Sequence, residues 1–246
     1  MSAFLLLLAC LLLGAAVARL ARPPAGLSPA LNTWVINVAL PALVLELVPR
    51  LSPDPALWLL VVSQWGVFAG AFLLFRALGR TLGWPGARIG ALTLVCGLGN
   101  TSFMGYPLIE ALRGREALAL AAVADQAGCF LMLATGGVAV AVLYGGGAVR
   151  ARDLAARVLL FPPFVALCAG AAAGFAGGWP PLLEQALHAL GLTLSPLALF
   201  AVGLRVRLSL ARDQLAAAGL GLSWKLLLAR SACSAWATRR ARPASC

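Results

Sequence analysis

The stretch GLGNTSFMGYPLIEAL, residues 97–112, lies inside a segment that is otherwise apolar enough to cross a membrane. It combines three glycines and a proline with three adjacent polar residues, Asn100, Thr101 and Ser102. Irregular backbone at membrane depth is tolerated only where protein buries it or water lines it. The stretch therefore predicts either a kink that lets neighbouring helices pack closely or one wall of a polar site.

Pro107 is the residue of this stretch that most directly disturbs a helix. A proline inside a helix removes the partner of the carbonyl four residues earlier, here that of Phe103. Gly99 and Gly105 weaken the same segment, because glycine destabilises a helix interior by about 0.5–1 kcal/mol relative to alanine. Discontinuous helices hold substrates at mid-membrane in secondary transporters. We therefore expect the three polar residues to bind a substrate at a broken helix.

The composition places the whole chain in a membrane. Hydrophobic residues make up 62% of its 246 residues and charged residues 11%, whereas soluble domains are about half apolar and about a quarter charged. A helix satisfies its own backbone in lipid, and a span needs about 20 mostly apolar residues. The first candidate span also resembles a signal peptide, but no basic residue precedes it, so a retained helix is expected. Eight candidate spans lie at roughly 2–19, 31–49, 56–78, 88–112, 117–144, 158–177, 182–204 and 214–229.

The net charge of +11 follows membrane topology. If the N-terminus lies outside, the inner loops hold Arg19, Arg22, Arg76, Arg80, Arg88, Arg150, Arg152, Arg157, Arg205, Arg207 and Arg212. The outer loops before the last span hold only Arg50, Arg113 and Arg115. This bias is the positive-inside pattern. We therefore expect a multi-pass protein of the cell membrane (plasma or inner), with its N-terminus outside and no nucleic-acid partner.

The sequence offers little for catalysis or metal binding. Four of the six cysteines lie inside candidate spans, where free cysteine behaves as a small apolar residue. His188 is the only histidine, and the sequence contains no C-x-x-C pair. A metal site built from His and Cys therefore has too few ligands. We expect no enzyme activity, no catalytic residue, no metal and no cofactor.

Two further prolines indicate an internal repeat. The segments LNTWVINVALPALVLELV (Leu31–Val48) and LHALGLTLSPLALFAVG (Leu187–Gly203) each carry one proline at mid-span, Pro41 and Pro196. Each proline is expected to break its helix. Five helices separate the two positions, an odd number, so the second copy enters the membrane inverted, as in many transporters. The predicted fold is all-α and polytopic, with inverted five-helix repeats.

The repeat divides the chain into four segments. Residues 1–144 form the first repeat, 145–157 a cytoplasmic linker, 158–229 a partial second repeat of three helices, and 230–246 an irregular basic tail. No counterpart of the 97–112 stretch occurs before the tail. We expect that the coding frame is lost just before the second broken helix; a natural basic tail is the alternative.

The segment NTSFMGYPLIEALRG, residues 100–114, resembles the fourth-helix motif of the auxin efflux carrier family, which includes bacterial malonate and malate permeases. The pattern L-N-x-x-V-x-x-V-A-L-P-A from Leu31, A-D-Q around Asp125 and P-L-A-L-F-A-V-G-L from Pro196 are similar as well. The resemblance implies ten helices in two inverted repeats, with broken fourth and ninth helices that cross at the substrate site. It implies that Asn100 contacts the substrate and that Pro107 sets the break. In this chain the second repeat is incomplete.

Polar residues in other spans are further candidates. Asp125 and Gln126 lie near one end of the fifth span, where a carboxylate is costly and usually faces the bundle interior. They are candidate ion-coupling groups, or groups that shape the site; an interfacial position near the outer face is the alternative. Asn37 lies deep beside Pro41 and is predicted to line the substrate site.

Three charged residues near the outer face are assigned no site. Glu46 is interpreted as an interfacial carboxylate near Arg50. Glu184 and His188 are one helical turn apart and are interpreted as a local polar pair.

The predicted function is a secondary transporter, or permease, of small organic anions such as dicarboxylates, which works by alternating access. The alternative is a truncated, non-transporting membrane protein that lacks the second crossover helix. The expected partners are a small organic anion and the lipid bilayer, and a homodimer is left open.

Overall fold

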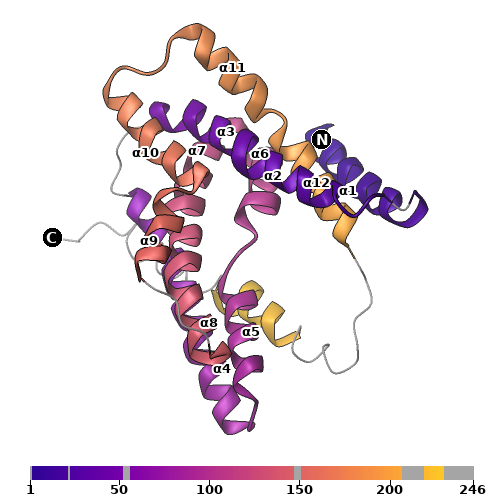
Figure 1. The fold of residues 1–246 in the computed structure, drawn as a ribbon, viewed down its shortest axis with the longest axis vertical. Coiled ribbons are helices and arrows are strands. Elements are labelled where there is room, and N and C mark those ends of the chain that lie inside the picture. Colours follow the sequence, from indigo (N-terminus) through magenta and orange to yellow (C-terminus); the bar gives the residue numbers. More distant parts are fainter. Residues whose placement is uncertain (1, 22, 52–55, 147–150, 207–218, 230–246) are drawn as a thin grey trace, which may run out of the picture.

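The chain is almost entirely helical in its computed structural model, which describes residues 2–21, 23–51, 56–146, 151–206 and 219–229. No strand occurs among these residues. The α-helices are α1 (Ser2–Leu20), α2 (Leu27–Trp34), α3 (Leu40–Leu47), α4 (Ala56–Thr81), α5 (Gly86–Gly97), α6 (Tyr106–Arg113), α7 (Leu118–Val123), α8 (Val138–Gly145), α9 (Ala151–Leu159), α10 (Pro162–Phe175), α11 (Pro181–Gly191) and α12 (Leu194–Arg205) (Figure 1). The π-helical segments are η1 (Val35–Ala39), η3 (Thr101–Gly105), η5 (Ala124–Phe130), η6 (Leu133–Gly137) and η7 (Trp224–Ala229), and the 3₁₀ turns are η2 (Val48–Arg50) and η4 (Arg115–Ala117).

Successive elements join into helices long enough to cross a membrane. Four such helices, Leu27–Arg50, Leu57–Thr81, Arg115–Gly145 and Pro181–Arg205, meet both length and hydropathy requirements, and Leu5–Leu20 and Pro162–Phe175 are shorter apolar helices. The prediction of an all-α polytopic membrane protein is confirmed. The eighth predicted span, 214–229, is described only from residue 219, and the tail 230–246 lies outside the described residues.

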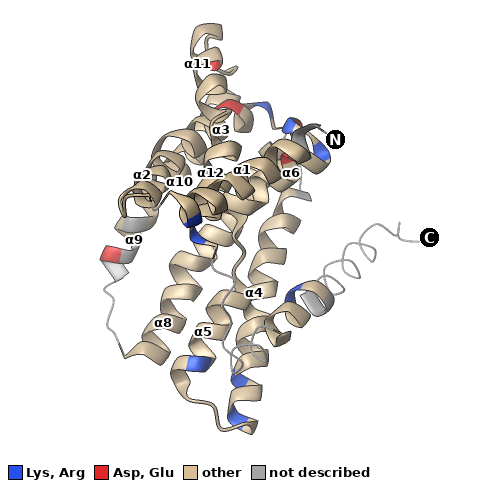
Figure 2. Ribbon diagram, turned by 90° about the vertical axis from the view of Figure 1, so that its right-hand side faces the viewer, with Lys and Arg blue, Asp and Glu red and all other residues tan. Residues whose placement is uncertain are grey.

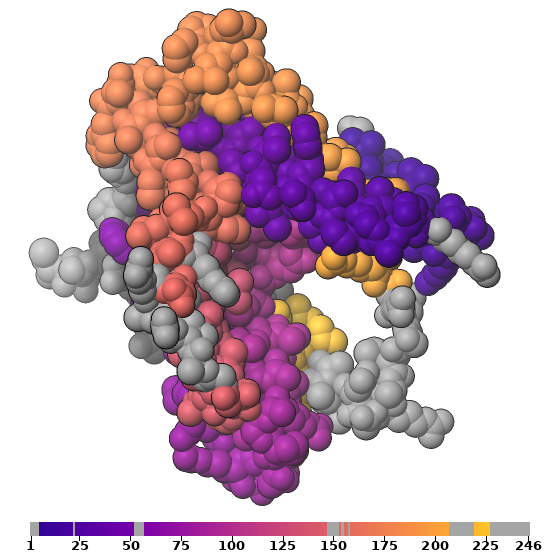
Figure 3. Space-filling view, in the orientation of Figure 1, coloured from indigo at the N-terminus to yellow at the C-terminus, as the bar shows by residue number. Residues whose placement is uncertain are grey.

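Helices from the two predicted repeats pack against one another. Helix α1 lies along α12, and α3 contacts both α10 and α11, so the early and late parts of the chain share one layer (Figures 1 and 3). Helices α4, α5 and α8 form a second bundle, which extends to one side of this layer. The main hydrophobic core joins α3 to α6, α7, α10 and α12, and includes Leu43, Tyr106, Leu118 and Leu194.

The crossing of α1 and α12 depends on two glycines. A Cβ atom placed on Gly14 would lie 2.2 Å from the carbonyl oxygen of Phe200, and one on Gly203 would lie 2.2 Å from that of Leu11. Small residues at a helix crossing let two backbones approach closely, which drives helix association in lipid. These two glycines therefore allow α1 and α12 to pack closely against each other.

Charged side chains gather toward the two ends of the molecule, and one of these ends carries both acidic and basic residues. Figure 2 shows the arginines of α4 and α5 at one end of the bundle, whereas most acidic residues lie near α3, α6 and α11 at the other end. Large apolar side chains such as Leu73, Val95 and Leu143 are exposed between these ends. Apolar side chains that face outward between polar ends are what a bilayer requires.

The prolines at 41 and 196 act differently from each other. At Pro41 the helix stays continuous from Leu27 to Arg50, because the π-helical segment η1 precedes the proline and shifts the hydrogen bonds, with the Leu40 N–H donating to the Val35 carbonyl. The predicted break is thus replaced by a local widening of the helix. Near Pro196 the long helix Pro181–Arg205 contains a two-residue turn, Leu192 and Thr193, between the end of α11 at Gly191 and the start of α12 at Leu194, and both turn residues keep helical backbone angles.

The predicted linker contains a helix that the sequence did not reveal. Residues 145–157 were expected to be a cytoplasmic connection, but α9 begins at Ala151 and continues to Leu159. The helix packs near the start of α10 and near η6. Its mixed charged and alanine-rich sequence lacks the apolar run that identified the spans.

Candidate functional site

The fourth predicted span is interrupted at residues 98–100. Helix α5 ends at Gly97, Leu98 is extended (φ −103°, ψ 145°), and helical structure resumes at Thr101 (Figure 1). The interruption lies upstream of Pro107, which occupies the first turn of α6 and is buried. Of the residues expected to break this helix, Gly99 lies inside the interruption, whereas Gly105 and Pro107 lie in the helical segment that follows it. A Cβ on Gly97 would lie 3.0 Å from the Phe68 ring, so α4 packs closely against the point where α5 ends.

Asn100 begins the second half of the broken helix. Its side-chain Oδ1 accepts a hydrogen bond from the Phe103 N–H (3.4 Å), and its main-chain carbonyl accepts from the N–H groups of Met104 (3.2 Å) and Gly105 (3.1 Å). A side-chain oxygen in this position satisfies one of the donors that a helix N-terminus leaves free. Because Oδ1 is used for the cap, the amide Nδ2 of Asn100 is left to donate to another group.

Asp125 forms hydrogen bonds with the segment that follows the break. The carboxylate accepts hydrogen bonds from the hydroxyls of Thr101 and Ser102 (2.8 Å for Ser102) and from the Gln126 side-chain amide (2.7 Å). Asp125 is only 3% exposed, so its carboxylate faces the protein interior. Three donors around a buried carboxylate stabilise its charge and fix the donors in place. The hydroxyls of Thr101 and Ser102 therefore hold the break in position through Asp125.

Two buried polar atoms lie beside this cluster without a partner. Within the described residues, neither the Tyr106 hydroxyl nor the Gln126 Oε1 makes a hydrogen bond, although Tyr106 lies close to Asp125. Buried polar groups are paired in the great majority of cases. The Tyr106 hydroxyl and the Gln126 side chain therefore extend the buried polar cluster around Asp125.

A polar cavity of about 370 Å³ opens next to Asn100. Its lining residues come from α2, the broken helix and the end of α12, and are Asn32, Asn100, Phe103, Ala201, Val202, Arg205 and Val206. Asn37 does not line it: Asn37 lies on an exposed face of the helix and donates to the Thr33 carbonyl (2.8 Å). Of the four residues predicted to bind substrate, Asn100 is the one that the structure places in this cavity.

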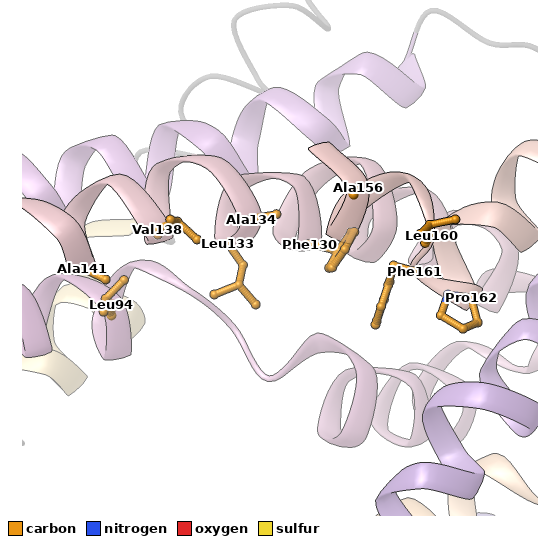
Figure 4. A pocket seen from close by; sticks show the side chains of 11 residues that line it. Leu94, Phe130, Leu133, Ala134, Val138, Ala141, Ala156, Leu160, Phe161 and Pro162 are labelled. Carbon is orange, nitrogen blue, oxygen red and sulfur yellow. The ribbon is translucent and has the colours of Figure 1, made fainter. Parts of the chain in front are cut away.

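A larger cavity, of about 720 Å³, is apolar (Figure 4). It lies between η5–α8 and the start of α10, and its walls include Leu94, Leu133, Leu160 and the stacked rings of Phe130 and Phe161, whose centroids are 4.1 Å apart. The lining offers no side-chain donor or acceptor, so it does not suit a polar solute. The smaller cavity beside Asn100 is the better candidate for the functional site.

The comparison with known proteins identifies the family of the chain. The family profile described as "Membrane transport protein" matches residues 3–219, most of the chain. The chain belongs to this family. The resemblance to the auxin efflux carrier family is thereby confirmed.

Named relatives in this family are transporters. The chain is 27% identical over 202 residues to an "Uncharacterized transporter" of Methanothermobacter thermautotrophicus, a match that covers 80% of this chain and 65% of the relative. It is 31% identical over 142 residues (55% of this chain, 44% of the relative) to another "Uncharacterized transporter", of Methanocaldococcus jannaschii. It is 30% identical over 205 residues (80% and 63%) to a protein of Rhizobium meliloti provisionally named a malonate transporter. The chain thus spans less than two thirds of the length of each of these relatives.

A second polar cluster joins the two predicted repeats at the other end of the molecule. Glu46 is buried and contacts Arg115 (2.5 Å) and His188 (2.8 Å); it lies near Arg50, as expected, but pairs with residues distant in the sequence. Arg50 pairs instead with Glu184 (2.5 Å), which means that Glu184 and His188 do not form a local pair.

The broken helix contributes to this same cluster. Glu110 of α6 lies 3.6 Å from Arg115 and accepts a hydrogen bond from Ser195 of α12 (2.5 Å). The sequence missed this network because its hydrogen bonds from Arg115 to Glu46, from His188 to Glu46 and from Ser195 to Glu110 join residues 69 to 142 positions apart.

No group of three or more His, Cys, Asp or Glu side chains that could hold a metal ion occurs within the described part of the chain. The four described cysteines, Cys10, Cys96, Cys129 and Cys168, are free. The site is thus an arrangement of amide, guanidinium and carboxylate groups around an interrupted helix.

Proposed function

We propose that this member of the membrane transport protein family is a secondary transporter of small organic anions that works by alternating access. The observation that carries the proposal is the position of Asn100, which begins the second half of an interrupted helix and lines a polar cavity. Irregular backbone at membrane depth that borders a polar cavity is typical of transporter substrate sites.

The interrupted helix favours an anionic substrate. Residues 101–113 form one helical segment whose N-terminus lies at Asn100. A helix N-terminus carries a partial positive charge and free N–H groups, and both attract anions. The residues predicted to contact substrate, Asn100, Thr101 and Ser102, are then divided between two roles: Asn100 contacts the substrate, and the two hydroxyls fix the segment through Asp125.

Dicarboxylates are the proposed substrates within this class. The cavity volume of about 370 Å³ exceeds that of a three- or four-carbon diacid, and ligand pockets are commonly about 300–1,000 Å³. The printed name of the Rhizobium meliloti relative, which mentions malonate, supports the same choice. The driving force is an ion gradient or the gradient of the substrate itself, and a coupling role for Asp125 and Gln126 is part of the proposal.

The protein is proposed to lie in the cell membrane with its N-terminus outside. Arg76 and Arg80 near the end of α4 and Arg88 in α5 are then cytoplasmic, in agreement with the positive-inside rule. A reporter inserted between α4 and α5 is expected in the cytoplasm, and an external reporter would overturn this orientation.

Counterflow in proteoliposomes tests the proposed function. Vesicles that contain the protein and are loaded with unlabelled malonate should accumulate labelled malonate from outside faster than protein-free vesicles. Labelled malonamide, which has the same skeleton without charge, should not accumulate. Equal accumulation in vesicles with and without protein, over a panel of malonate, malate and succinate, would contradict the proposal.

A further inference from the structure

We propose that Arg205, assisted by Asn32, is the residue that selects an anion in the cavity beside Asn100. The inference rests on the proposed function and extends it, since it assigns the recognition of the substrate carboxylate to a side chain of α12. Sequence patterns give Arg205 only a topological role, as one of the inner-loop arginines.

The position of Arg205 distinguishes it from other arginines that the sequence assigns to the inner loops. Arg205 is the last residue of α12 and lines the cavity together with Asn100. Arg88 lies over the Trp84 ring (4.5 Å), and Arg76 donates to the Tyr144 hydroxyl (3.3 Å). Among the arginines whose side chains the structure describes, Arg205 is the one that shares a cavity with the interrupted helix.

The guanidinium of Arg205 makes one hydrogen bond, through its Nε. Its Nε donates a hydrogen bond to the Ser28 hydroxyl on α2 (2.7 Å), and this contact joins two elements 177 residues apart. The two terminal nitrogens make no hydrogen bond or ion pair with other described residues. An arginine oriented through Nε presents its terminal N–H groups as a pair, the geometry that binds a carboxylate in a bidentate manner.

The described carboxylates near the two polar clusters are already engaged elsewhere. Glu46 pairs with Arg115 and His188, Glu184 pairs with Arg50, and Asp125 is surrounded by its three donors. Among the described residues, none of these acids neutralises Arg205. The cavity therefore combines a positive side chain with the positive end of the helix at Asn100, and an anion is the complementary ligand.

The lining matches a short organic acid in polarity as well as charge. Asn100 offers its amide Nδ2, since its Oδ1 caps the helix, and Asn32 adds a second amide on the α2 side. Phe103, Ala201 and Val202 supply apolar surface between these polar groups. A carboxylate held by Arg205, with a short carbon skeleton against the apolar wall, uses both kinds of lining.

Kinetics of the Arg205→Gln variant in the counterflow assay test this assignment. We expect the KM for malonate to rise about tenfold or more, because a hydrogen bond to a charged group contributes about 1.5–3 kcal/mol. Arg205→Lys should recover part of the loss, since the charge remains but the bidentate geometry does not. The matched control is Arg80→Gln, which removes the same charge from the exposed end of α4 and should leave the KM unchanged.

A substrate comparison separates recognition from folding. Malonamide carries no carboxylate for Arg205 to bind, so Arg205→Gln should reduce the wild-type preference for malonate over malonamide, measured as competitors of labelled malonate in counterflow, an outcome that a misfolded protein cannot produce. An unchanged KM and preference in Arg205→Gln, beside active wild-type protein, would overturn the role of Arg205. A wild-type protein that transports none of the acids would instead contradict the proposed function itself. If Arg205→Gln does not fold, thermal stabilisation of Arg205→Lys by malonate equal to that of wild type would overturn the assignment.

Discussion

Asp125 illustrates how one buried carboxylate organises the site. Its donors come from Thr101 and Ser102, which follow the interruption, and from Gln126, its neighbour in η5. The sequence identified all four residues as candidates but assigned the hydroxyls to the substrate. The pairing depends on how η3 packs against η5, and periodicity alone does not determine that contact.

The Asp125→Asn variant should weaken the hydrogen bonds that residue 125 makes with Thr101, Ser102 and Gln126. An asparagine presents an N–H₂ group where the carboxylate presented an acceptor, so at least one charge-assisted hydrogen bond is lost. We expect the unfolding free energy in detergent to fall by about 1.5–3 kcal/mol, seen as a lower Tm in a circular dichroism melt. Asp153→Asn, on an exposed position of α9, is the control and should not change the Tm. Equal melting of both variants would show that Asp125 does not stabilise the break.

Glu46 and Glu184 provide a contrast between a buried and an exposed ion pair. The side chains of Glu46 and Arg115 are 2% and 22% exposed, whereas those of Arg50 and Glu184 are 57% and 39% exposed. Removing one partner of a fully buried pair costs about 3–5 kcal/mol. For Glu46→Gln we expect about 2 kcal/mol, because Arg115 is partly exposed and keeps Glu110 nearby.

Glu184→Gln is the matched control for this prediction. An exposed ion pair contributes about 0–1 kcal/mol, so the Tm of Glu184→Gln should stay close to that of the wild type. The measurement is thermal unfolding of the purified protein in detergent, followed by tryptophan fluorescence. A larger loss for Glu184→Gln than for Glu46→Gln would contradict the burial that the structure assigns to these two residues.

At the scale of elements, the sequence predicted that the fourth span is broken but not where. Pro107 was the strongest signal, yet it lies inside the continuous helical segment 101–113, where the π-helical segment η3 precedes it and shifts the hydrogen bonds. The interruption instead falls at Leu98–Asn100, where α4 packs against Gly97. The sequence was no better guide at Pro41, where a break was also expected. A π-helical segment accommodates this proline, and hydropathy patterns do not reveal such a segment.

The crossing of α1 and α12 yields a prediction at this scale. Gly14→Ala places a methyl group where the Phe200 carbonyl oxygen lies at 2.2 Å, so the two helices must separate and the Tm should fall. Gly66→Ala in α4 is the control, because nothing lies within 4 Å of its Cβ position. That control should be neutral or stabilising by up to about 1 kcal/mol, through its higher helix propensity. The Tm of each variant is measured by size-exclusion chromatography of samples heated to increasing temperatures. An equal Tm for the two variants would contradict the close crossing of α1 and α12.

At the scale of the whole molecule, composition and hydropathy were sufficient to predict a polytopic helical membrane protein. They also located the described spans to within a few residues, as in the expected 56–78 and the observed helix Ala56–Thr81. The Glu46 network, the cavity position of Arg205 and helix α9 were not predicted. Each depends on packing between distant segments or on a short helix without an apolar run.

The central claim is that substrate binds at the interrupted helix, and the two asparagines predicted for the site allow a direct test. Asn100 lines the polar cavity, whereas Asn37 bonds to the Thr33 carbonyl on an exposed face. The decisive measurement is malonate counterflow by proteoliposomes that contain wild-type, Asn100→Ala or Asn37→Ala protein at equal, verified insertion. The account predicts that Asn100→Ala abolishes counterflow and that Asn37→Ala retains it. Full counterflow by Asn100→Ala would contradict a substrate site at the break.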